Sequence, residues 1–468
     1  MKNLYFVASR DVFAAFPGAL PIVPPAPTAA ILSPLPLPTA ESPDKLGSIH
    51  MQKSGVQFNS LGLASLLFIA NLFGAFAADW PGWRGPNRDD LCTETGLLKD
   101  WPKDGPPMVW KATGLGEGYS TVAISGGHIF TIGEKGPTSF VVALNVADGS
   151  PFWTVKLGQS GAPGGYAGPR GAPTVDGEYL YALGHYGELG CFETATGKEH
   201  WHKNLTKDFG GTAPGWGYAE APLVDGNKVV FTPGGSQGAI VALDKTSGAE
   251  LWRSKEFTDP VHYSSLVPAE IGGVRQYIQL TPRSVVGIQA SDGKLLWRAA
   301  RKGNVAVIPT PIYHDGYVYV TSGYGIGDNL FQISESGGNF TAKEVYSNKV
   351  IVNHHGGVIL VGDYVYGYSD GKGWTCQDFK TGEAKWQDKE KLGKGCLSYA
   401  DGRFYLRQED GAGTVALIET SPAGYKEHGR FNPPSRSDKN SWTHPVISGG
   451  KLYLRDQDVL LCYDVKAK

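Results

Sequence analysis

Two adjacent histidines, His354 and His355, carry the side chains of this sequence that are best suited to proton transfer or metal binding. An imidazole titrates near neutral pH and is a common metal ligand. The pair precedes an expected inner strand, and neighbouring residues of a strand point to opposite faces of the sheet. We therefore expect that the two rings do not share one metal ion, and the sequence predicts no metal site.

The cysteines also limit the chemistry that is open to the chain. They stand far apart, without CxxC or CxxCH spacing, which argues against a zinc knuckle and against covalent haem. The count is odd, so at least one thiol stays unpaired within the chain, while one or two disulfides remain open alternatives after export. The cysteines are Cys92, Cys191, Cys376, Cys396 and Cys462.

Phosphate-containing ligands are not indicated. The stretch Gly114-Leu115-Gly116-Glu117-Gly118 is rich in glycine, but no helix is expected after it and no lysine ends it, so it is read as a connecting loop. The net charge of −2, with 19% charged residues, gives no electrostatic reason to expect nucleic acid or an anionic membrane as a partner.

Tryptophan marks a repeat with a period near 48 residues. Five tryptophans follow one another at spacings of 43 to 51 residues, and a sixth lies 89 residues further on, with Tyr346 at the skipped position. From the second onward, each follows a short apolar strand and a turn ending in Gly, as in VVALNVADGSPFW. A large ring at the end of an outer strand fills the space between neighbouring units, so these residues are read as structural. They are Trp110, Trp153, Trp201, Trp252, Trp297 and Trp386.

A second hairpin lies earlier in each unit. It consists of an apolar strand, an Asp-Gly or Gly-Gly turn, and a strand of alternating aromatic and β-branched residues, as in APTVDGEYLYAL. Two hairpins give four antiparallel strands, which is one blade of a β-propeller. The sequence therefore predicts an all-β chain that forms an eight-bladed β-propeller. The eight turns are at Gly126, Gly177, Gly226, Gly272, Gly316, Gly362, Gly402 and Gly449.

The two ends of the repeat region predict how the ring closes. The last unit ends at VLLCYDVKAK without a fourth strand, and an unassigned strand, Pro107–Trp110, stands before the first unit. We expect this N-terminal strand to complete the last blade, because closure removes two open sheet edges. An open β-solenoid is the alternative.

The inner strands of a propeller line its central channel, and the residues just before them should surround one mouth of that channel. The side chains at these places differ from unit to unit and combine aromatic surface with both signs of charge. Such a ring suits a sugar, a peptide or a small planar ligand, and the alternative is a water-filled funnel. The predicted ligand-binding residues are Tyr119, Arg170, Trp216, Tyr218, Glu220, Tyr263, His355, Lys394, Trp442 and His444.

The segment before the first unit, WPGWRGPNRDD, is expected to pack across one face of the propeller. Trp80 and Trp83 are read as docking residues of this segment rather than as ligand contacts, and Arg84 and Asp89 are assigned to the same packing role.

The repeat pattern AxDxxTGxxxW resembles the PQQ-like propeller repeat. It is similar to the family that holds the bacterial outer-membrane assembly propeller lipoprotein and, more distantly, the quinoprotein alcohol dehydrogenases. The opening WPGWRGPNRDD resembles a secreted bacterial subfamily with this fold. The resemblance covers about residues 79–468 and implies an eight-bladed propeller, whereas function varies widely among propellers.

The sequence departs from these relatives at the positions that carry their chemistry. Quinoprotein dehydrogenases have a vicinal disulfide under the quinone and a calcium-binding carboxylate set, and this chain has no adjacent cysteines and no matching carboxylate motif. No cofactor is therefore expected, and PQQ is not supported. The assembly lipoprotein carries a lipobox cysteine, which is absent from AFAADW.

The first residues are read as targeting sequence. Residues 1–50 are rich in Pro and Ala and are interpreted as an upstream extension, with Met51 as the true start. Residues 51–77 have the pattern of a signal peptide, with a basic Lys53, an apolar stretch and the A-x-A site Ala75–Ala77. Residues 78–468 would then be one exported propeller domain, found in the periplasm or outside the cell. An uncleaved anchor is the alternative.

Two functions from different classes follow from these observations. The first is a cell-envelope scaffold that binds a protein, peptide or glycan at the channel mouth, as a monomer and without nucleic acid. The second is an oxidoreductase that uses a quinone or a metal in the central channel. The missing disulfide and calcium set favour the first.

Overall fold

The structure is a computed structural model, and it describes residues 79–468. The predicted upstream extension (1–50), the signal peptide (51–77) and the cleavage site before Ala78 lie outside the described residues. The described part is made of strands β1 to β33 and one short 3₁₀ turn, η1 (Pro163–Gly165). None of its segments is a helix of the length and apolar character needed to cross a membrane.

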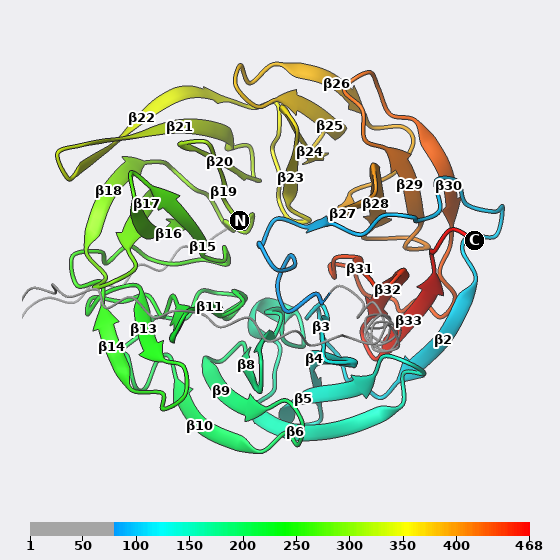
Figure 1. The fold of residues 1–468 in the computed structure, drawn as a ribbon, viewed down its shortest axis with the longest axis horizontal. Coiled ribbons are helices and arrows are strands. Elements are labelled where there is room, and N and C mark those ends of the chain that lie inside the picture. The colour runs from blue at the N-terminus through cyan, green and yellow to red at the C-terminus, as the bar shows by residue number, and fades with distance from the viewer. Residues whose placement is uncertain (1–78) are drawn as a thin grey trace, which may run out of the picture. The chain divides into compact units, whose positions relative to one another are not determined.

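Eight sheets, each with four antiparallel strands, surround a central axis (Figure 1). In seven sheets four strands follow one another in sequence from the axis to the rim, and in the eighth the outer strand comes from the N-terminal side of the propeller, so every sheet is one blade. The eight predicted glycine turns all lie between the first and second strands of the blades. The predictions of an all-β chain and of an eight-bladed propeller are therefore confirmed.

The first four blades have these strands. Blade 1 contains β3 (Ala123–Ser125), β4 (His128–Lys135), β5 (Thr138–Asn145) and β6 (Pro151–Gln159). Blade 2 contains β7 (Thr174–Asp176), β8 (Tyr179–Leu183), β9 (Glu188–Glu193) and β10 (Glu199–Asn204). Blade 3 contains β11 (Leu223–Asp225), β12 (Lys228–Phe231), β13 (Val241–Asp244) and β14 (Glu250–Arg253). Blade 4 contains β15 (Val267–Ile271), β16 (Val274–Leu280), β17 (Ser284–Gln289) and β18 (Leu295–Ala300).

The last four blades complete the ring. Blade 5 contains β19 (Ile312–His314), β20 (Tyr317–Ser322), β21 (Gly327–Ser336) and β22 (Asn339–Asn348). Blade 6 contains β23 (Val358–Val361), β24 (Tyr364–Ser369), β25 (Gly373–Asp378) and β26 (Ala384–Asp388). Blade 7 contains β27 (Gly395–Ala400), β28 (Arg403–Gln408), β29 (Val415–Glu419) and β30 (Glu427–Phe431), with β1 (Leu91–Cys92) added parallel to β27. Blade 8 contains β31 (Val446–Ser448), β32 (Lys451–Asp456), β33 (Val459–Asp464) and β2 (Met108–Thr113).

The N-terminal strand closes the ring as predicted. Strand β2 pairs antiparallel with β33, with Trp110 opposite Cys462, and so supplies the outer strand that the C-terminal blade lacks. In Figure 1 the blue-cyan β2 lies beside the red β33, although the two strands come from opposite ends of the propeller sequence.

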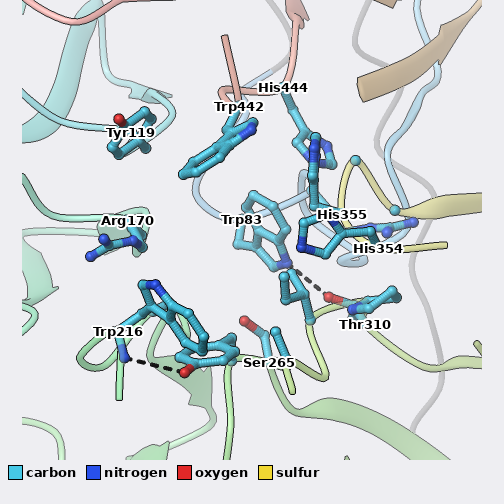
Figure 2. Close-up of a pocket in the computed structure, with 18 of the residues that line it drawn as sticks. Trp83, Tyr119, Arg170, Trp216, Ser265, Thr310, His354, His355, Trp442 and His444 are labelled. Carbon is cyan, nitrogen blue, oxygen red and sulfur yellow. Dashed lines mark hydrogen bonds between the residues drawn. The ribbon is translucent and has the colours of Figure 1, made fainter. Parts of the chain in front are cut away.

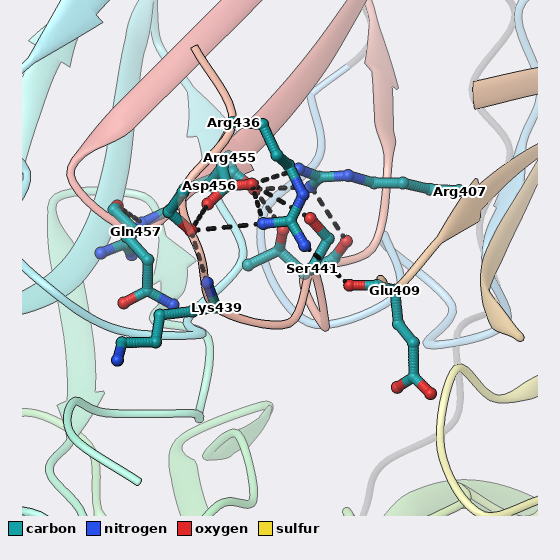
Figure 3. Close-up of polar contacts among 10 residues, drawn as sticks. Arg407, Glu409, Arg436, Lys439, Ser441, Arg455, Asp456 and Gln457 are labelled. Atoms are coloured by element: carbon teal, nitrogen blue, oxygen red, sulfur yellow. Dashed lines mark hydrogen bonds and ion pairs between the residues drawn. The ribbon is translucent and has the colours of Figure 1, made fainter. Parts of the chain in front are cut away.

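Buried arginines add polar links around this closure (Figure 3). Arg455 in blade 8 donates hydrogen bonds to the carbonyl oxygens of Ser120 (2.8 Å) and Ile132 (2.8 Å) in blade 1. Arg407 in blade 7 donates to Thr443 Oγ1 at 2.6 Å, just before blade 8. Because a buried guanidinium must satisfy its N–H groups, these contacts hold blades 7, 8 and 1 together.

The outer tryptophans connect each blade to the next. The indole of Trp201 in blade 2 donates to the carbonyl oxygen of Lys245 in blade 3 at 3.0 Å, and Trp252 donates to Ala290 in blade 4 at 3.1 Å. The same bond runs from Trp110, Trp153 and Trp386 to the following blade. Tyr346, at the skipped position, makes it through its hydroxyl, which donates to Phe379 O at 3.0 Å.

Trp297 is the exception, since its indole donates to Gln276 of its own blade at 2.8 Å. The next blade has the long hairpin β21–β22, which turns at Gly337–Gly338 rather than with the Asp/Thr/Ser-Gly turn of its neighbours. In the blades that accept this bond, the turn between the third and fourth strands supplies the acceptor carbonyl oxygen. Blade 5 has a different turn at this place, so Trp297 lacks that acceptor.

The segment before β2 crosses the axis of the propeller. Trp80 exchanges backbone hydrogen bonds with Ile124 of blade 1 (2.8 and 2.7 Å), and the carbonyl of Pro81 accepts from Val175 of blade 2. Arg88 donates to Ala221 O beside blade 3, and Arg84 donates to Val358 O of blade 6. Figure 1 shows this blue segment running through the middle of the ring. We call residues 80–92 the axial segment, and it closes one side of the central channel.

Candidate functional site

A cavity of about 200 Å³ lies at the mouth of the channel (Figure 2). Its walls come from the loops that precede the inner strands of blades 1 to 6 and 8, and the axial segment contributes Trp83 and Arg84. The cavity therefore has a floor and opens to one side of the ring. Its aromatic lining residues are Trp83, Tyr119, Tyr166, Trp216, Tyr263, Tyr324 and Trp442, together with His354, His355 and His444.

The structure brings together seven of the ten residues that the sequence suggested for this site. They are Tyr119, Arg170, Trp216, Tyr263, His355, Trp442 and His444. Each stands just before an inner strand, except Trp216, which lies slightly further upstream. Equivalent positions in the repeats therefore do converge around the axis.

The other three suggested residues do not line the cavity. Tyr218 is buried, and its hydroxyl donates to Pro233 O at 2.9 Å. Glu220 turns into blade 3, where it accepts hydrogen bonds from the backbone and hydroxyl of Thr232. Lys394 lies behind the wall, between His354 Nδ1 (2.8 Å) and Asp370 (2.9 Å). In all three cases a local partner within or beside the blade holds the side chain away from the cavity.

Several lining residues were not predicted. Trp83 was read only as a docking residue, but it lines the cavity while its Nε1 donates to Thr310 Oγ1 at 2.9 Å. Tyr166 and Tyr324 come from the loops after β6 and β20, which the hairpin pattern does not mark. Arg84 also lines the cavity, and its guanidinium forms an ion pair with Asp90. For Tyr166 and Tyr324, the one feature of the sequence that could have indicated a role is that their loops interrupt the repeat.

Arg170 is one of two arginines in the cavity wall. Its guanidinium lies 5.9 Å from the centre of the Tyr119 ring and donates to Tyr166 O at 3.0 Å. Among residues 79–468 it makes no ion pair with a carboxylate, and its other hydrogen bond goes to Gly168 O at 3.4 Å. Burial lowers the pKa of Arg170 from its ordinary value, although a guanidinium keeps its charge at neutral pH. Arg170 thus presents a positive charge beside aromatic surface.

The two adjacent histidines both line the cavity. They lie on a bend before β23 rather than on a strand, and their ring centres are 5.1 Å apart, so the expected opposite orientation does not occur. Burial lowers the pKa of His354 to about 4, and its Nε2 contacts the Tyr324 hydroxyl at 3.0 Å. Burial also disfavours charge on His355, but hydrogen bonds with Cys396 and Glu409 raise its pKa above the ordinary value.

A network of buried groups lies beneath His355 and His444. Asp90 of the axial segment contacts His444 Nδ1 at 3.1 Å and pairs with Arg84 Nε at 3.1 Å. Burial disfavours charge on His444, but the neighbouring Cys396 and Asp90 raise its pKa to about 9. The axial segment thus supplies the carboxylate that orients one histidine of the cavity.

The residues of the cavity do not match the donor set of a quinone–calcium site. All five cysteines are free and buried, and none is adjacent to another. Within residues 79–468, no cluster of three or more histidine, cysteine or acidic side chains has the geometry to hold a metal ion. We therefore assign no chemistry at this site to such a cofactor.

Fold and cavity define an eight-bladed propeller of PQQ-like repeats with a blind, aromatic-lined site at one channel mouth. The family model described as outer membrane protein assembly factor BamB matches residues 137–388, more than half of the chain, and the chain belongs to this family. The resemblance to PQQ-like propellers is thereby confirmed.

Two curated relatives carry the name outer membrane protein assembly factor BamB. The protein from Xanthomonas campestris pv. campestris is 28% identical over 209 residues, which is 43% of this chain and 46% of that protein. The protein from Burkholderia pseudomallei is 26% identical over 196 residues, which is 39% of this chain and 46% of that protein. The matched region thus spans less than half of each relative.

Solved structures agree on the fold. BamB from Moraxella catarrhalis aligns with a TM-score of 0.53 and 15% identity over 77% of this chain and 98% of that one. Quinohemoprotein alcohol dehydrogenase from Comamonas testosteroni aligns with a TM-score of 0.58 and 13% identity over 84% of this chain and 81% of that one. At these identities the likeness concerns the fold alone.

Proposed function

We propose that this protein is an exported scaffold of the cell envelope that binds a segment of a partner protein in its channel-mouth cavity. The observation that carries the proposal is the cavity itself, which places one unpaired guanidinium, Arg170, among aromatic walls. The names of the curated relatives, which describe outer membrane protein assembly factors, support an envelope protein as the partner.

The size and chemistry of the cavity suggest what it holds. Its volume of about 200 Å³ is below the usual ~300–1,000 Å³ of sites that enclose a whole small ligand. It fits one planar side chain of a larger partner, stacked against Trp216 or Trp442, with a carboxylate near Arg170. An aromatic residue with a neighbouring acidic group, or a free C-terminus, has this chemistry.

Site-specific crosslinking tests the proposal. A photo-crosslinking amino acid at Tyr324, which lines the cavity and is 41% exposed, is expected to capture a partner segment from envelope extract. The matched control is the same amino acid at Leu251, which is 45% exposed on outer strand β14. Arg170→Gln should reduce the yield at position 324 about ten-fold, equivalent to about 1.4 kcal/mol of binding free energy.

The outcome discriminates among the alternatives. Equal capture at positions 251 and 324, or capture that does not respond to Arg170→Gln, places the binding surface outside the cavity and overturns the proposal. Capture of a glycan instead of a peptide replaces the partner but keeps the site. N-terminal sequencing of the native protein tests the export step, and a mature chain that retains residues 1–50 contradicts it.

A further inference from the structure

Four hydroxyl groups line the part of the channel-mouth cavity that blades 4 and 5 supply. They belong to Tyr263, Ser265, Thr310 and Tyr324, and we call these four side chains the hydroxyl wall. Ser265 and Thr310 are each only 3% exposed, although both line the cavity (Figure 2). A hydroxyl group has one proton to donate and two lone pairs that accept, so the direction of its existing bond decides what remains for a ligand.

The two buried hydroxyls already accept a hydrogen bond from the protein. Ser265 Oγ accepts from the backbone N–H of Ala221 at 3.1 Å, and Thr310 Oγ1 accepts from Trp83 Nε1 at 2.9 Å. Neither hydroxyl has another hydrogen-bond partner in the described part of the chain. Because an N–H group only donates, both O–H protons still need an acceptor, which a ligand or a water molecule in the cavity can supply.

Tyr263 has the same bonding pattern. Its hydroxyl oxygen accepts from the backbone N–H of Trp216 at 3.2 Å and has no second partner among the residues that the structure describes. Burial raises the pKa of Tyr263 above its ordinary value, so the hydroxyl keeps its proton at neutral pH. This proton is therefore also available to an acceptor in the cavity.

The direction of the fourth bond, between Tyr324 and His354, follows from the neighbours of the histidine. His354 Nδ1 lies 2.8 Å from Lys394 Nζ, which also pairs with Asp370 at 2.9 Å. An ammonium group has three donors and no acceptor, so Nδ1 must carry the lone pair and Nε2 the proton. Nε2 therefore donates to the Tyr324 hydroxyl oxygen at 3.0 Å, and the Tyr324 proton is free for another acceptor.

The other polar side chains of the cavity are donors or cations. None of the residues that line it within the described part of the chain is Asp, Glu, Asn or Gln. Arg170 adds a positive charge beside aromatic surface. His355 and His444 each contact a carboxylate outside the lining, Glu409 and Asp90, and an opposite charge favours the protonated ring. The cavity thus offers hydrogen-bond protons and positive charge to whatever enters it.

We propose that the hydroxyl wall selects a carboxylate, so that a partner segment places an acidic side chain or its C-terminal carboxylate in the cavity. Both oxygens of a carboxylate only accept hydrogen bonds, whereas the NH2 of a carboxamide would face O–H protons and an ammonium group would meet the charge of Arg170. The inference deepens the proposed function and rests on it for the partner, but the selectivity of the cavity can be measured without that partner.

Blocked dipeptides of nearly equal shape test this selectivity on the unaltered protein. N-acetyl-Phe-Glu-amide and N-acetyl-Phe-Gln-amide differ only in carboxylate or carboxamide, and N-acetyl-Phe-Lys-amide carries an ammonium group. Saturation-transfer NMR measures their dissociation constants, and we expect the Glu peptide to bind about ten-fold more tightly than the Gln peptide and the Lys peptide not to bind. Equal affinity for the Glu and Gln peptides, tighter binding of the Lys peptide, or no binding of the Glu peptide at millimolar concentration overturns the proposal.

A fourth peptide distinguishes the two sources of the carboxylate. N-acetyl-Phe-Gln with a free C-terminus has a carboxylate only at its end. If it binds as tightly as the Glu peptide, the cavity accepts a chain terminus. If it binds no better than the blocked Gln peptide, the carboxylate must come from a side chain.

Substitutions separate the hydroxyl wall from the charge of Arg170. Tyr324→Phe and Ser265→Ala each remove one O–H donor and should each reduce the preference for the Glu over the Gln peptide about three-fold. The control is Tyr179→Phe at the start of β8, which lies outside the cavity lining and should leave the preference unchanged. A preference that survives both Tyr324→Phe and Ser265→Ala assigns the selectivity to Arg170 alone and contradicts the role of the hydroxyls.

Lys394 acts as a positioning residue, and its role has a separate readout. In the unaltered protein the ¹⁵N NMR signals of His354 should be those of a ring protonated at Nε2. Lys394→Met frees Nδ1, so we expect a mixture of the two tautomers together with a weaker preference for the Glu peptide. An unchanged tautomer in this variant contradicts the assignment.

The peptide and crosslinking experiments fail in different ways. Selective binding of the Glu peptide without capture of a partner at position 324 supports the chemistry of the cavity and overturns the scaffold function. Capture of a partner together with equal binding of the Glu and Gln peptides supports the scaffold function and overturns the selectivity.

Discussion

The rim and the centre of this propeller use the same repeat in opposite ways. At the rim, tryptophan recurs at one position, and nearly every indole makes the same bond to the next blade. At the centre, the positions just before the inner strands carry different side chains, and most of these line one cavity. Repetition therefore marks packing between equal neighbours, whereas variation at equivalent positions marks the place where the molecule is asymmetric.

The largest expected loss of stability comes from deleting the N-terminal residues that complete the rim and also cross the centre. Deletion of residues 79–113 removes the outer strand of blade 8 and the segment that crosses the axis. It leaves β33 with an open edge and the cavity without its floor. We expect the melting temperature, measured by circular dichroism, to fall by more than 10 °C or cooperative unfolding to be lost. An unchanged melting temperature would show that closure contributes nothing.

A matched pair of tryptophan substitutions separates rim from centre. Trp252→Ala should lower the free energy of unfolding by about 3–5 kcal/mol, because it empties a buried space between blades 3 and 4. Trp216→Ala, at the half-buried cavity wall, should change stability by less than about 1 kcal/mol but reduce crosslinking at Tyr324. Urea denaturation measures both, and the comparison fails if the two variants exchange these effects.

Glu220 should make the free energy of unfolding depend on pH, because it belongs to a loop at the channel mouth but its side chain points into the blade. Burial raises its pKa to about 7, above its ordinary value. A carboxyl with a raised pKa in the folded state contributes its full stability below the unfolded pKa of about 4.3 and loses it as the pH rises through 7.

Replacement of this carboxyl by an amide tests the assignment. Glu220→Gln should therefore gain about 1–3 kcal/mol relative to the unaltered protein between pH 5 and pH 8.5. Unfolding free energies measured across this range provide the test, and parallel curves for the two proteins contradict the buried position.

The smallest expected effect concerns two turns of blade 3, one between its two outer strands and one between its two inner strands. Gly248 has φ +69°, and a Cβ there would lie 2.8 Å from the Trp201 ring, whereas a Cβ at Gly226, with φ +62°, would meet nothing within 4 Å. Both alanine substitutions carry the strain of a positive φ, which costs about 1 kcal/mol. Gly248→Ala should cost about 1 kcal/mol more, because only there the tryptophan of the preceding blade must move. Thermal melting of the two variants side by side measures the difference.

The same contrast explains which features could be predicted from the sequence. The eight hairpins and the closing strand follow from spacing and turn chemistry, since each blade has the same neighbours. The mouth positions of Tyr119, Arg170 and Trp442 could be found because they stand at equivalent places before inner strands. For Glu220 and Lys394 the place was right but the direction of the side chain was not predictable, because it depends on contacts with Thr232 and Asp370 that the repeat pattern does not mark.

Other parts of the site had no periodic signal at all. Tyr166 and Tyr324 extend from loops that interrupt the repeat, and the contribution of Trp83 depends on where the axial segment crosses the ring. The contact of His444 with Asp90 joins two residues whose separation along the chain hides their proximity. Such contacts exist only once the ring is closed.

The pairing of β2 with β33 also has a consequence for the order of events during synthesis. Strand β2 leaves the ribosome early, but its partner, Val459–Asp464, is made only after all the intervening blades. Throughout that interval β2 has an unpaired edge, and contacts between such distant parts of a chain form slowly. A chain that stops before blade 8 therefore leaves this edge permanently open to aggregation or proteolysis. Only a chain that includes β33 can cover this edge of β2.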